Sequence, residues 1–247
     1  MVDVRGGLKA FGYNPKLIME MLKCDLGIAL FQGTQPIFFQ NHAKEPLIPY
    51  ELGPLIPGHR DIDETDMSWD PTYLKINTDL VHAWTAMRNF CSTINSVTER
   101  KRRLSKEILL NTMASVMYRL LALESFDHNS LDEAVRLGLL AFSYLVFLRF
   151  ENVKLPQRHF PQKYWACLQS LRTSEVPSDL RLWLFVIGAI AFASPDDDTS
   201  SLALLRIDVK SYGAYQLTES LHLLRHFLWI EILVQSPGKA VLESLRS

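Results

Sequence analysis

The stretch that decides the fold lies at residues 180–193 and has the sequence LRLWLFVIGAIAFA. Drawn as a helix it has no polar face, and a helix that is apolar all round belongs in the centre of a core. Pro177-Ser178-Asp179, just before it, is a typical helix start. The run is about 14 residues long, whereas a membrane-spanning helix needs roughly 20. Since Arg181 also lies near its start, we predict a buried helix and no membrane span.

Helix signals recur along the rest of the chain. Ser130-Leu131-Asp132-Glu133 has the form of a capping box, in which the serine and the glutamate satisfy each other's backbone N–H groups. The apolar run at residues 137–150 that follows predicts a second central helix. Further helix starts are expected at Asn14-Pro15, Asp70-Pro71, Ser105, Pro161 and Ser236-Pro237, with Gly33 as a stop. We also expect helices at residues 201–212 and in the second apolar stretch, LHLLRHFLWIEI, at residues 221–232.

These signals predict an all-α protein built as a multi-helix bundle or as stacked helix pairs, with about eight or nine helices. Residues 33–71 differ from the rest, because six prolines and three glycines fall among them. We therefore expect an irregular segment there, with Ile37-Phe38-Phe39 as the one short stretch that could form a strand. The whole chain, 1–247, is expected to form a single helical domain.

Composition limits the function classes. Hydrophobic residues make up 48% of the chain, which is enough for a sizeable core, and the formal net charge is -1. That balance provides no global field to attract nucleic acid. The three cysteines, Cys24, Cys91 and Cys167, are far apart and form no C-x-x-C pair. The spacing predicts neither a disulfide framework nor a zinc site, and it fits a reducing intracellular compartment.

Two acidic patterns are similar to motifs found in enzymes. Asp196, Asp197 and Asp198 resemble the aspartate clusters that hold magnesium in all-α terpene cyclases, but the companion Asn/Ser/Glu triplet is missing. We interpret them as an acidic loop that caps the N-terminus of the next helix, where the helix dipole favours negative charge. Asp61-x-Asp63-x-Thr65 matches the D-x-D-x-T pattern of phosphoryl-transfer enzymes with an aspartate nucleophile, yet no strand precedes it. We interpret it as a solvated loop.

Histidine and aspartate residues on two of the expected helices are candidates for a site. His222 and His226 lie four residues apart on one helix face, a spacing that can bind zinc, but no H-E-x-x-H glutamate and no third ligand accompany them. Asp25 lies between Leu22 and Leu26. A buried carboxylate needs partners, so we predict a structural network around it.

One basic run, Arg100-Lys101-Arg102-Arg103, stands between two expected helices. A solvated turn is the preferred interpretation, with a nuclear import signal or a nucleic-acid contact as alternatives. Arg102-Arg103-Leu104-Ser105 also has the pattern of a basic-directed phosphorylation site. No nucleophile-elbow, Walker A or dinucleotide-binding pattern occurs. The sequence thus predicts no catalytic residues, no cofactor and no bound metal.

Four segments, taken in order, resemble one family. They are RGGLKAFGYNPKLIMEMLKCDLGIALFQGTQPIF (residues 5–38), DEAVRLGLLAFSYLVF (132–147), LRLWLFVIGAIAF (180–192) and LLRHFLWIE (223–231). The set is similar to the helical regulatory region of fungal-specific transcription factors of the Zn₂Cys₆ binuclear-cluster class. In that family the region follows a six-cysteine DNA-binding cluster, which this chain lacks.

The resemblance implies a non-catalytic regulator of transcription in the nucleus (otherwise in the cytoplasm), without its own DNA-binding cluster. Such a chain would act through a small-molecule effector or through protein partners, including a second copy or a full-length relative. Direct sequence-specific DNA binding is not expected. The sequence leaves two alternatives open. One is an all-α enzyme of isoprenoid-cyclase type using Asp196 to Asp198, and the other is a truncated gene product whose cluster is encoded upstream.

Overall fold

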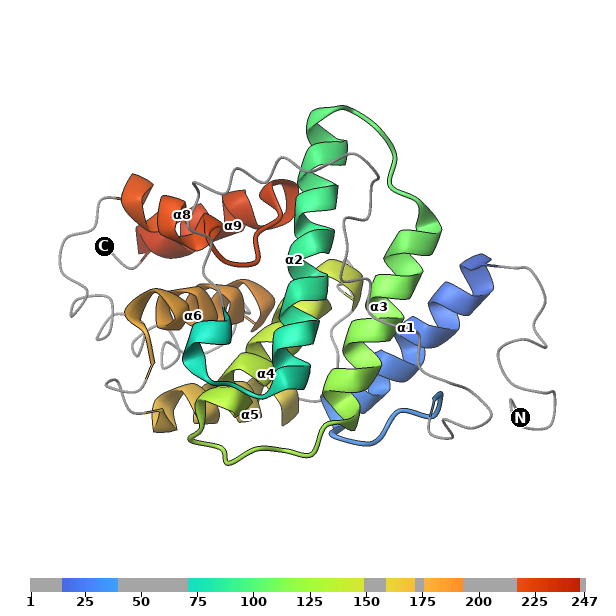
Figure 1. Cartoon of the computed structure of the whole chain (residues 1–247), viewed down its shortest axis with the longest axis horizontal. Coiled ribbons are helices and arrows are strands. Elements are labelled where there is room, and N and C mark those ends of the chain that lie inside the picture. Colours follow the sequence, from blue (N-terminus) through green and yellow to red (C-terminus); the bar gives the residue numbers. More distant parts are fainter. Residues whose placement is uncertain (1–14, 40–70, 149–158, 172–175, 193–216, 245–247) are drawn as a thin grey trace.

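Every regular element in the described part of the chain is helical (Figure 1). The computed structural model describes residues 15–39, 71–148, 159–171, 176–192 and 217–244. Eight α-helices lie within these ranges, and no strand does. The all-α prediction is confirmed. Of the helices in these ranges, none has the length and apolar character needed to cross a membrane.

The elements follow one another with short helical turns between some of them. In chain order they are α1 (Pro15–Gln32), the 3₁₀ turn η3 (Pro71–Leu74), α2 (Thr78–Glu99), α3 (Lys106–Ala122), α4 (Leu131–Ser143), the π-helical turn η4 (Tyr144–Leu148), α5 (His159–Ser170), α6 (Ser178–Phe192), α8 (Leu217–Arg225) and α9 (Glu231–Ser244).

Two helices, α4 and α6, form the centre of the core. Every residue of α4 from Glu133 to Ser143 is buried, and so is every residue of α6 from Leu180 to Ile190. The two helices pack directly against each other. The prediction of two central helices is therefore confirmed at both positions.

The other helices surround this pair. Helices α1, α3 and α2 lie next to one another in that order, and α4 contacts α2, α3 and α5 (Figure 1). On the other side α6 supports α8 and α9, and α9 also reaches α2. The end of α2 and the C-terminal helices, distant in sequence, thus become neighbours.

Several helix ends follow the sequence signals. Ser105 and Ser130 are N-caps whose side-chain oxygens accept the backbone N–H groups of Glu107 and Glu133. Helix α6 begins at Ser178, as expected. Gly33 ends α1 with φ 67°, and the following N–H of residue 34 donates to the carbonyl of Ala29.

One of the expected helix starts, Asp70-Pro71, is wrong in detail. Pro71 opens only the 3₁₀ turn η3, and α2 begins at Thr78, because the side chain of Asn77 accepts the N–H of Asp79 and makes the N-cap there. The capping box is half formed. The Ser130 hydroxyl oxygen accepts the N–H of Glu133. The Glu133 carboxylate, however, accepts from Arg136 in the interior and not from the backbone of Ser130.

The apolar stretch at residues 221–232 is not one helix. Helix α8 ends at Arg225, a turn covers residues 226–230, and α9 begins at Glu231. The predicted start at Ser236-Pro237 is also wrong, because Pro237 lies inside α9. Residues 37–39 form a bend and a turn and no strand, and the expected helix at 201–212 lies outside the described residues.

The packing of α4 on α6 has a direct test. A Cβ added at Gly138 would lie 2.5 Å from Leu184 Cδ2 and 3.0 Å from Trp183 Cζ3. Because both neighbours are buried in α6, we expect Gly138→Ala to lower the free energy of unfolding by about 1–3 kcal/mol in urea denaturation followed by circular dichroism.

Gly27→Ala is the matched control for this substitution. Gly27 lies within α1, and no atom approaches within 4 Å of its added Cβ. Alanine there should stabilise the protein by about 0.5–1 kcal/mol, because it reduces the freedom of the unfolded chain. Equal effects of the two substitutions would contradict the close approach of α4 and α6.

Candidate functional site

The buried Asp25 carboxylate has a structural role, because it accepts three hydrogen bonds within the protein. Its Oδ1 accepts the N–H of Ile37 at 2.7 Å, and its Oδ2 accepts the N–H of Phe38 at 3.0 Å and the Tyr118 hydroxyl at 2.9 Å. Both oxygens are thus engaged, and they hold the segment after α1 against α3. The predicted structural network is confirmed.

A second carboxylate, Glu133, is completely buried in a charge cluster. Arg136 donates to both of its oxygens, at 2.8 and 2.7 Å, and Lys163 of α5 lies 2.9 Å from Oε1. Arg136 also donates to the Leu120 carbonyl. Burial acts to raise the pKa of Glu133, but the hydrogen bonds and charges of Arg136 and Lys163 outweigh it and lower the pKa below its ordinary value of 4.5. The cluster joins α3, α4 and α5.

This cluster predicts a pH dependence of stability. Since the pKa of Glu133 is lower in the folded than in the unfolded protein, its contribution is complete above about pH 4.5 and is lost as the pH falls through the folded pKa. Glu133→Gln should therefore destabilise the protein at neutral pH, by at most about 3–5 kcal/mol. The deficit should shrink on acidification when denaturation is measured between neutral and strongly acid pH.

Glu243→Gln is the matched control, because Glu243 forms only an exposed pair with Lys239. Its stability curve should run parallel to that of the wild type at every pH. A Glu133→Gln deficit that stayed constant down to acid pH would refute the assigned ionisation of Glu133.

The buried thiols and one buried phenol are held in their neutral forms. Burial raises the pKa of Cys91 far above its ordinary value, and burial together with the Glu133 carboxylate raises that of Cys167 to about 12. Burial likewise raises the pKa of Tyr164, whose hydroxyl donates to the Leu184 carbonyl. Because the thiolate is the nucleophilic form of cysteine, a structural role in the core suits these thiols better than a role as catalytic nucleophiles.

The His222 and His226 rings contact each other edge to face, with centroids 4.7 Å apart. Within the described residues, no group of three or more His, Cys, Asp or Glu side chains could hold a metal ion. The two histidine rings thus lie together, as their spacing predicts, but no third ligand from the described residues lies with them.

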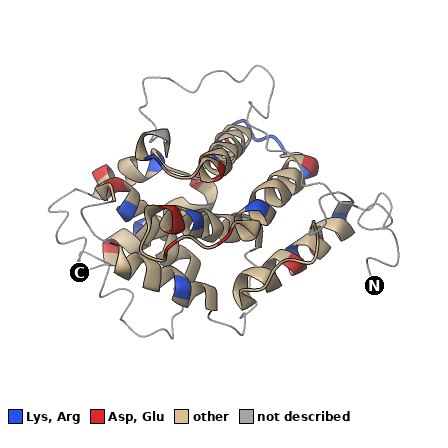
Figure 2. Cartoon of the chain, turned by 60° about the horizontal axis from the view of Figure 1, so that its bottom comes forward, with Lys and Arg blue, Asp and Glu red and all other residues tan. Residues whose placement is uncertain are grey.

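The basic run lies in the turn between α2 and α3. Arg100 caps α2, Lys101 adopts the left-handed conformation with φ 52°, and all four side chains are exposed. The other basic residues are scattered over the described helices (Figure 2). The prediction of a solvated turn is confirmed. The acidic patterns at residues 61–65 and 196–198 lie outside the described residues.

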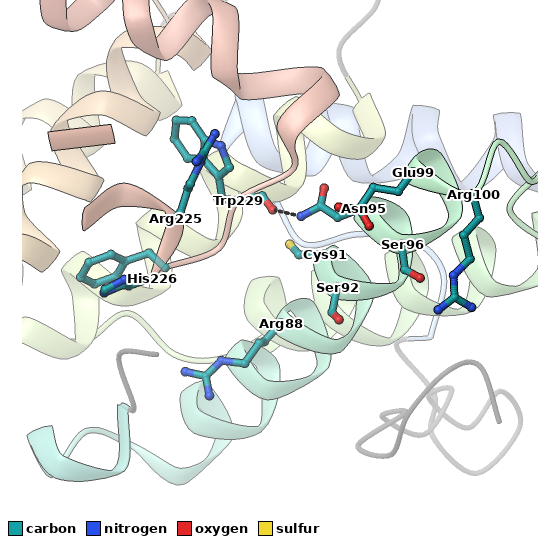
Figure 3. A pocket seen from close by; sticks show the side chains of 11 residues that line it. Arg88, Cys91, Ser92, Asn95, Ser96, Glu99, Arg100, Arg225, His226 and Trp229 are labelled. Atoms are coloured by element: carbon teal, nitrogen blue, oxygen red, sulfur yellow. Dashed lines mark hydrogen bonds between the residues drawn. The ribbon is translucent and has the colours of Figure 1, made fainter. Parts of the chain in front are cut away.

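A pocket of about 330 Å³ opens where α2 meets the turn between α8 and α9 (Figure 3). Arg88 and Arg100 mark the two ends of its α2 wall, and Arg225 and His226 stand on the facing wall. The pocket is lined by Arg88, Cys91, Ser92, Asn95, Ser96, Glu99, Arg100, Arg225, His226, Phe227 and Trp229. We call it the α2–α8/α9 pocket.

Asn95 joins the two walls of the α2–α8/α9 pocket. Its Nδ2 donates to the Trp229 carbonyl at 3.0 Å, and its Oδ1 accepts the N–H of Glu231 at 3.1 Å (Figure 3). The amide thereby satisfies a carbonyl in the turn and a backbone donor in the first turn of α9. A second bond supports the same segment, because Trp183 Nε1 of α6 donates to the Leu228 carbonyl.

Asn95→Ala should weaken the attachment of the α8–α9 turn and of the start of α9 to α2. Both backbone partners would lose a hydrogen bond in a partly buried place, which we expect to cost about 1–3 kcal/mol. Amide hydrogen exchange in the first turn of α9 should accelerate more than exchange in α3. Asn111→Ala, on α3, is the control and should leave exchange in α9 unchanged. Equal exchange in the two variants would show that Asn95 does not hold α9.

Comparison with known proteins adds no relative. No protein-family model, curated protein or solved structure matches the chain. The family resemblance accordingly rests on the four quoted segments alone.

Sequence reasoning missed the α2–α8/α9 pocket. Its walls come from residues 88–100 and 225–229, and neither set has a recognised spacing by itself. The sequence carries no signal that singles the pocket out. Residues 88, 92, 95, 96 and 99 are all polar and share one face of α2, but a polar face opposite buried apolar residues is the ordinary pattern of an amphipathic helix.

Proposed function

We propose that the chain is a non-catalytic, transcription-regulator-like helical domain that acts by binding a small-molecule effector or protein partners. The observation that carries this proposal is the α2–α8/α9 pocket, an open polar hollow at the joint between the helical body and the C-terminal helices. A ligand placed there would touch two parts of the chain that are distant in sequence, so its binding could favour one arrangement of the C-terminal helices over another.

Binding is favoured over catalysis by the state of the buried groups. The buried thiols of Cys91 and Cys167 are neutral, and the carboxylates of Asp25 and Glu133 are committed to internal hydrogen bonds. An activated nucleophile or general base usually has a pKa tuned towards neutrality, which these thiols lack.

The transcriptional part of the proposal rests on the resemblance of the four segments to the regulatory region of Zn₂Cys₆ regulators, and a nuclear location follows from it. The chain has three cysteines and a net charge of -1. It therefore cannot build a six-cysteine cluster and has no basic global field, so we propose that it reaches DNA through partners.

A reporter experiment tests the proposal. The whole chain is fused to a DNA-binding module of unrelated fold and expressed in fungal cells with a reporter gene behind the cognate sites. We expect a several-fold change in reporter output relative to the module alone, because a regulatory domain acts wherever it is tethered.

Two variants make this experiment decisive. Gly27→Ala, which preserves the fold, should act like the wild type, whereas Gly138→Leu should abolish the effect by forcing α4 from α6. Reporter output equal to that of the bare module would overturn the regulatory role. Sequence-specific binding of duplex DNA by the purified chain at physiological salt would overturn the proposed dependence on partners.

A further inference from the structure

We infer that the α2–α8/α9 pocket binds a small organic anion, a molecule that carries carboxylate or phosphate groups on a compact carbon frame. The inference deepens the proposed function and rests on it in one respect, since it names the chemical class of the effector. The site itself stands on the residues that line the pocket.

The charged side chains that line the pocket support the binding of an anion. Three arginines line the pocket, from two elements distant in sequence, against one glutamate, Glu99. Arginine stays protonated at any physiological pH and offers forked N–H donors that match carboxylate and phosphate oxygens. Of the three, Arg225 is held in place by Gln235 at 3.1 Å and by an ion pair with Glu231 at 2.8 Å, which offsets its charge. The positive charge of the rim therefore comes mainly from Arg88 and Arg100 on α2 and at its C-cap, within a chain that is nearly neutral overall.

The inner wall adds neutral polar groups. Ser92 and Ser96 stand one helical turn apart on α2, between Arg88 and Arg100 (Figure 3). Their hydroxyls can donate to ligand oxygens without adding charge. Asn95, between them in sequence, keeps one side-chain N–H beyond the one given to Trp229. The pocket therefore pairs cations at its rim with donors inside.

The remaining wall is aromatic and favours a ligand with carbon atoms over a bare inorganic ion. Phe227 and Trp229 line the pocket from the turn, and both are largely buried. The volume of about 330 Å³ is at the lower end for sites that take metabolites. A compact polycarboxylate or phosphate ester fits this combination of size, charge and ring surface.

An occupied pocket would strengthen the joint that Asn95 forms. The anion would contact α2 through Arg88 and the end of α8 through Arg225, and it would thus favour the arrangement in which α9 is docked. Binding would therefore slow amide exchange in the first turn of α9, at a place the ligand does not cover.

Calorimetric titration of the purified chain tests the inference. The probes are citrate, its neutral trimethyl ester and inorganic pyrophosphate, at low ionic strength and pH 7. We expect saturable one-site binding of citrate, no binding of the ester, and slower hydrogen exchange in the first turn of α9 with citrate present. Comparing pyrophosphate with citrate separates phosphate from carboxylate recognition, and tighter pyrophosphate binding would assign the site to phosphate esters.

Substitutions locate the site. Arg88→Gln and Arg225→Gln should each weaken citrate binding about tenfold or more, the effect expected from losing one charge-assisted hydrogen bond. Ser92→Leu should block binding by filling the pocket, without changing charge. Arg103→Gln removes an equal charge from the nearby exposed turn and should have little effect. Thermal melts of each variant without ligand report whether it is folded.

Three results would overturn the inference. They are equal binding of citrate and its ester, equal loss in Arg103→Gln and Arg88→Gln, and no binding of citrate or pyrophosphate to the folded wild type. Its failure is distinguishable from that of the proposed function. If citrate binds while the reporter fusion is inert, the site stands and the regulatory role falls. If Arg88→Gln loses citrate but drives the reporter like the wild type, the site is not the effector site.

Discussion

The close approach of α4 and α6 at Gly138 is the constraint on which the rest of the structure depends. Both helices are buried on all sides, and the missing side chain at Gly138 lets Trp183 and Leu184 of α6 lie against the α4 backbone. Trp183 then packs on Trp84 of α2 and on Phe227 of the turn, with ring centroids 5.1 and 6.1 Å apart. One contact in the centre thus positions α2 and the α8–α9 turn relative to each other.

Polar groups inside this core connect helices that the apolar contacts alone would leave free to slide. Hydrophobic packing is non-directional, whereas a buried carboxylate must be met by specific donors. Glu133 fixes α4 against α5 through Lys163, and Asp25 fixes α1 against α3 through Tyr118. Glu133 accepts from Arg136 of its own helix and Asp25 from the segment after its helix, and each also accepts from a neighbouring helix, so the register of the helices is specified as well as their proximity.

The sequence predicted what local chemistry controls and missed what distant residues control. Ser105 and Ser130 cap the helices they precede because a cap bonds to N–H groups only two or three residues away. The break after Arg225 has a different origin. An unbroken apolar stretch should continue as a helix, but the turn at 226–230 is stabilised by Asn95, more than a hundred residues earlier, and by Trp183 Nε1. No window along the sequence contains both partners of these bonds.

The same logic explains why α9 begins before its proline. The N–H of Glu231 is satisfied by Asn95, which provides the helix start that the sequence pattern had assigned to Ser236-Pro237. Pro237 then lies in the seventh position of α9, and the carbonyl left without its N–H partner belongs to Leu233, an exposed residue whose environment includes water.

The pocket is a consequence of this break. Had the helix continued through residues 226–230, its backbone groups would have bonded to one another and Asn95 would have had no partners there. Because the chain turns instead, Arg225, Phe227 and Trp229 face α2 across a hollow and not along a continuous helix surface. The place where local sequence rules fail is thus the place where the molecule presents an accessible polar pocket, because contacts between distant residues override the local helix preference there. Any ligand held there acts on a turn whose shape is kept by side-chain hydrogen bonds from distant parts of the chain.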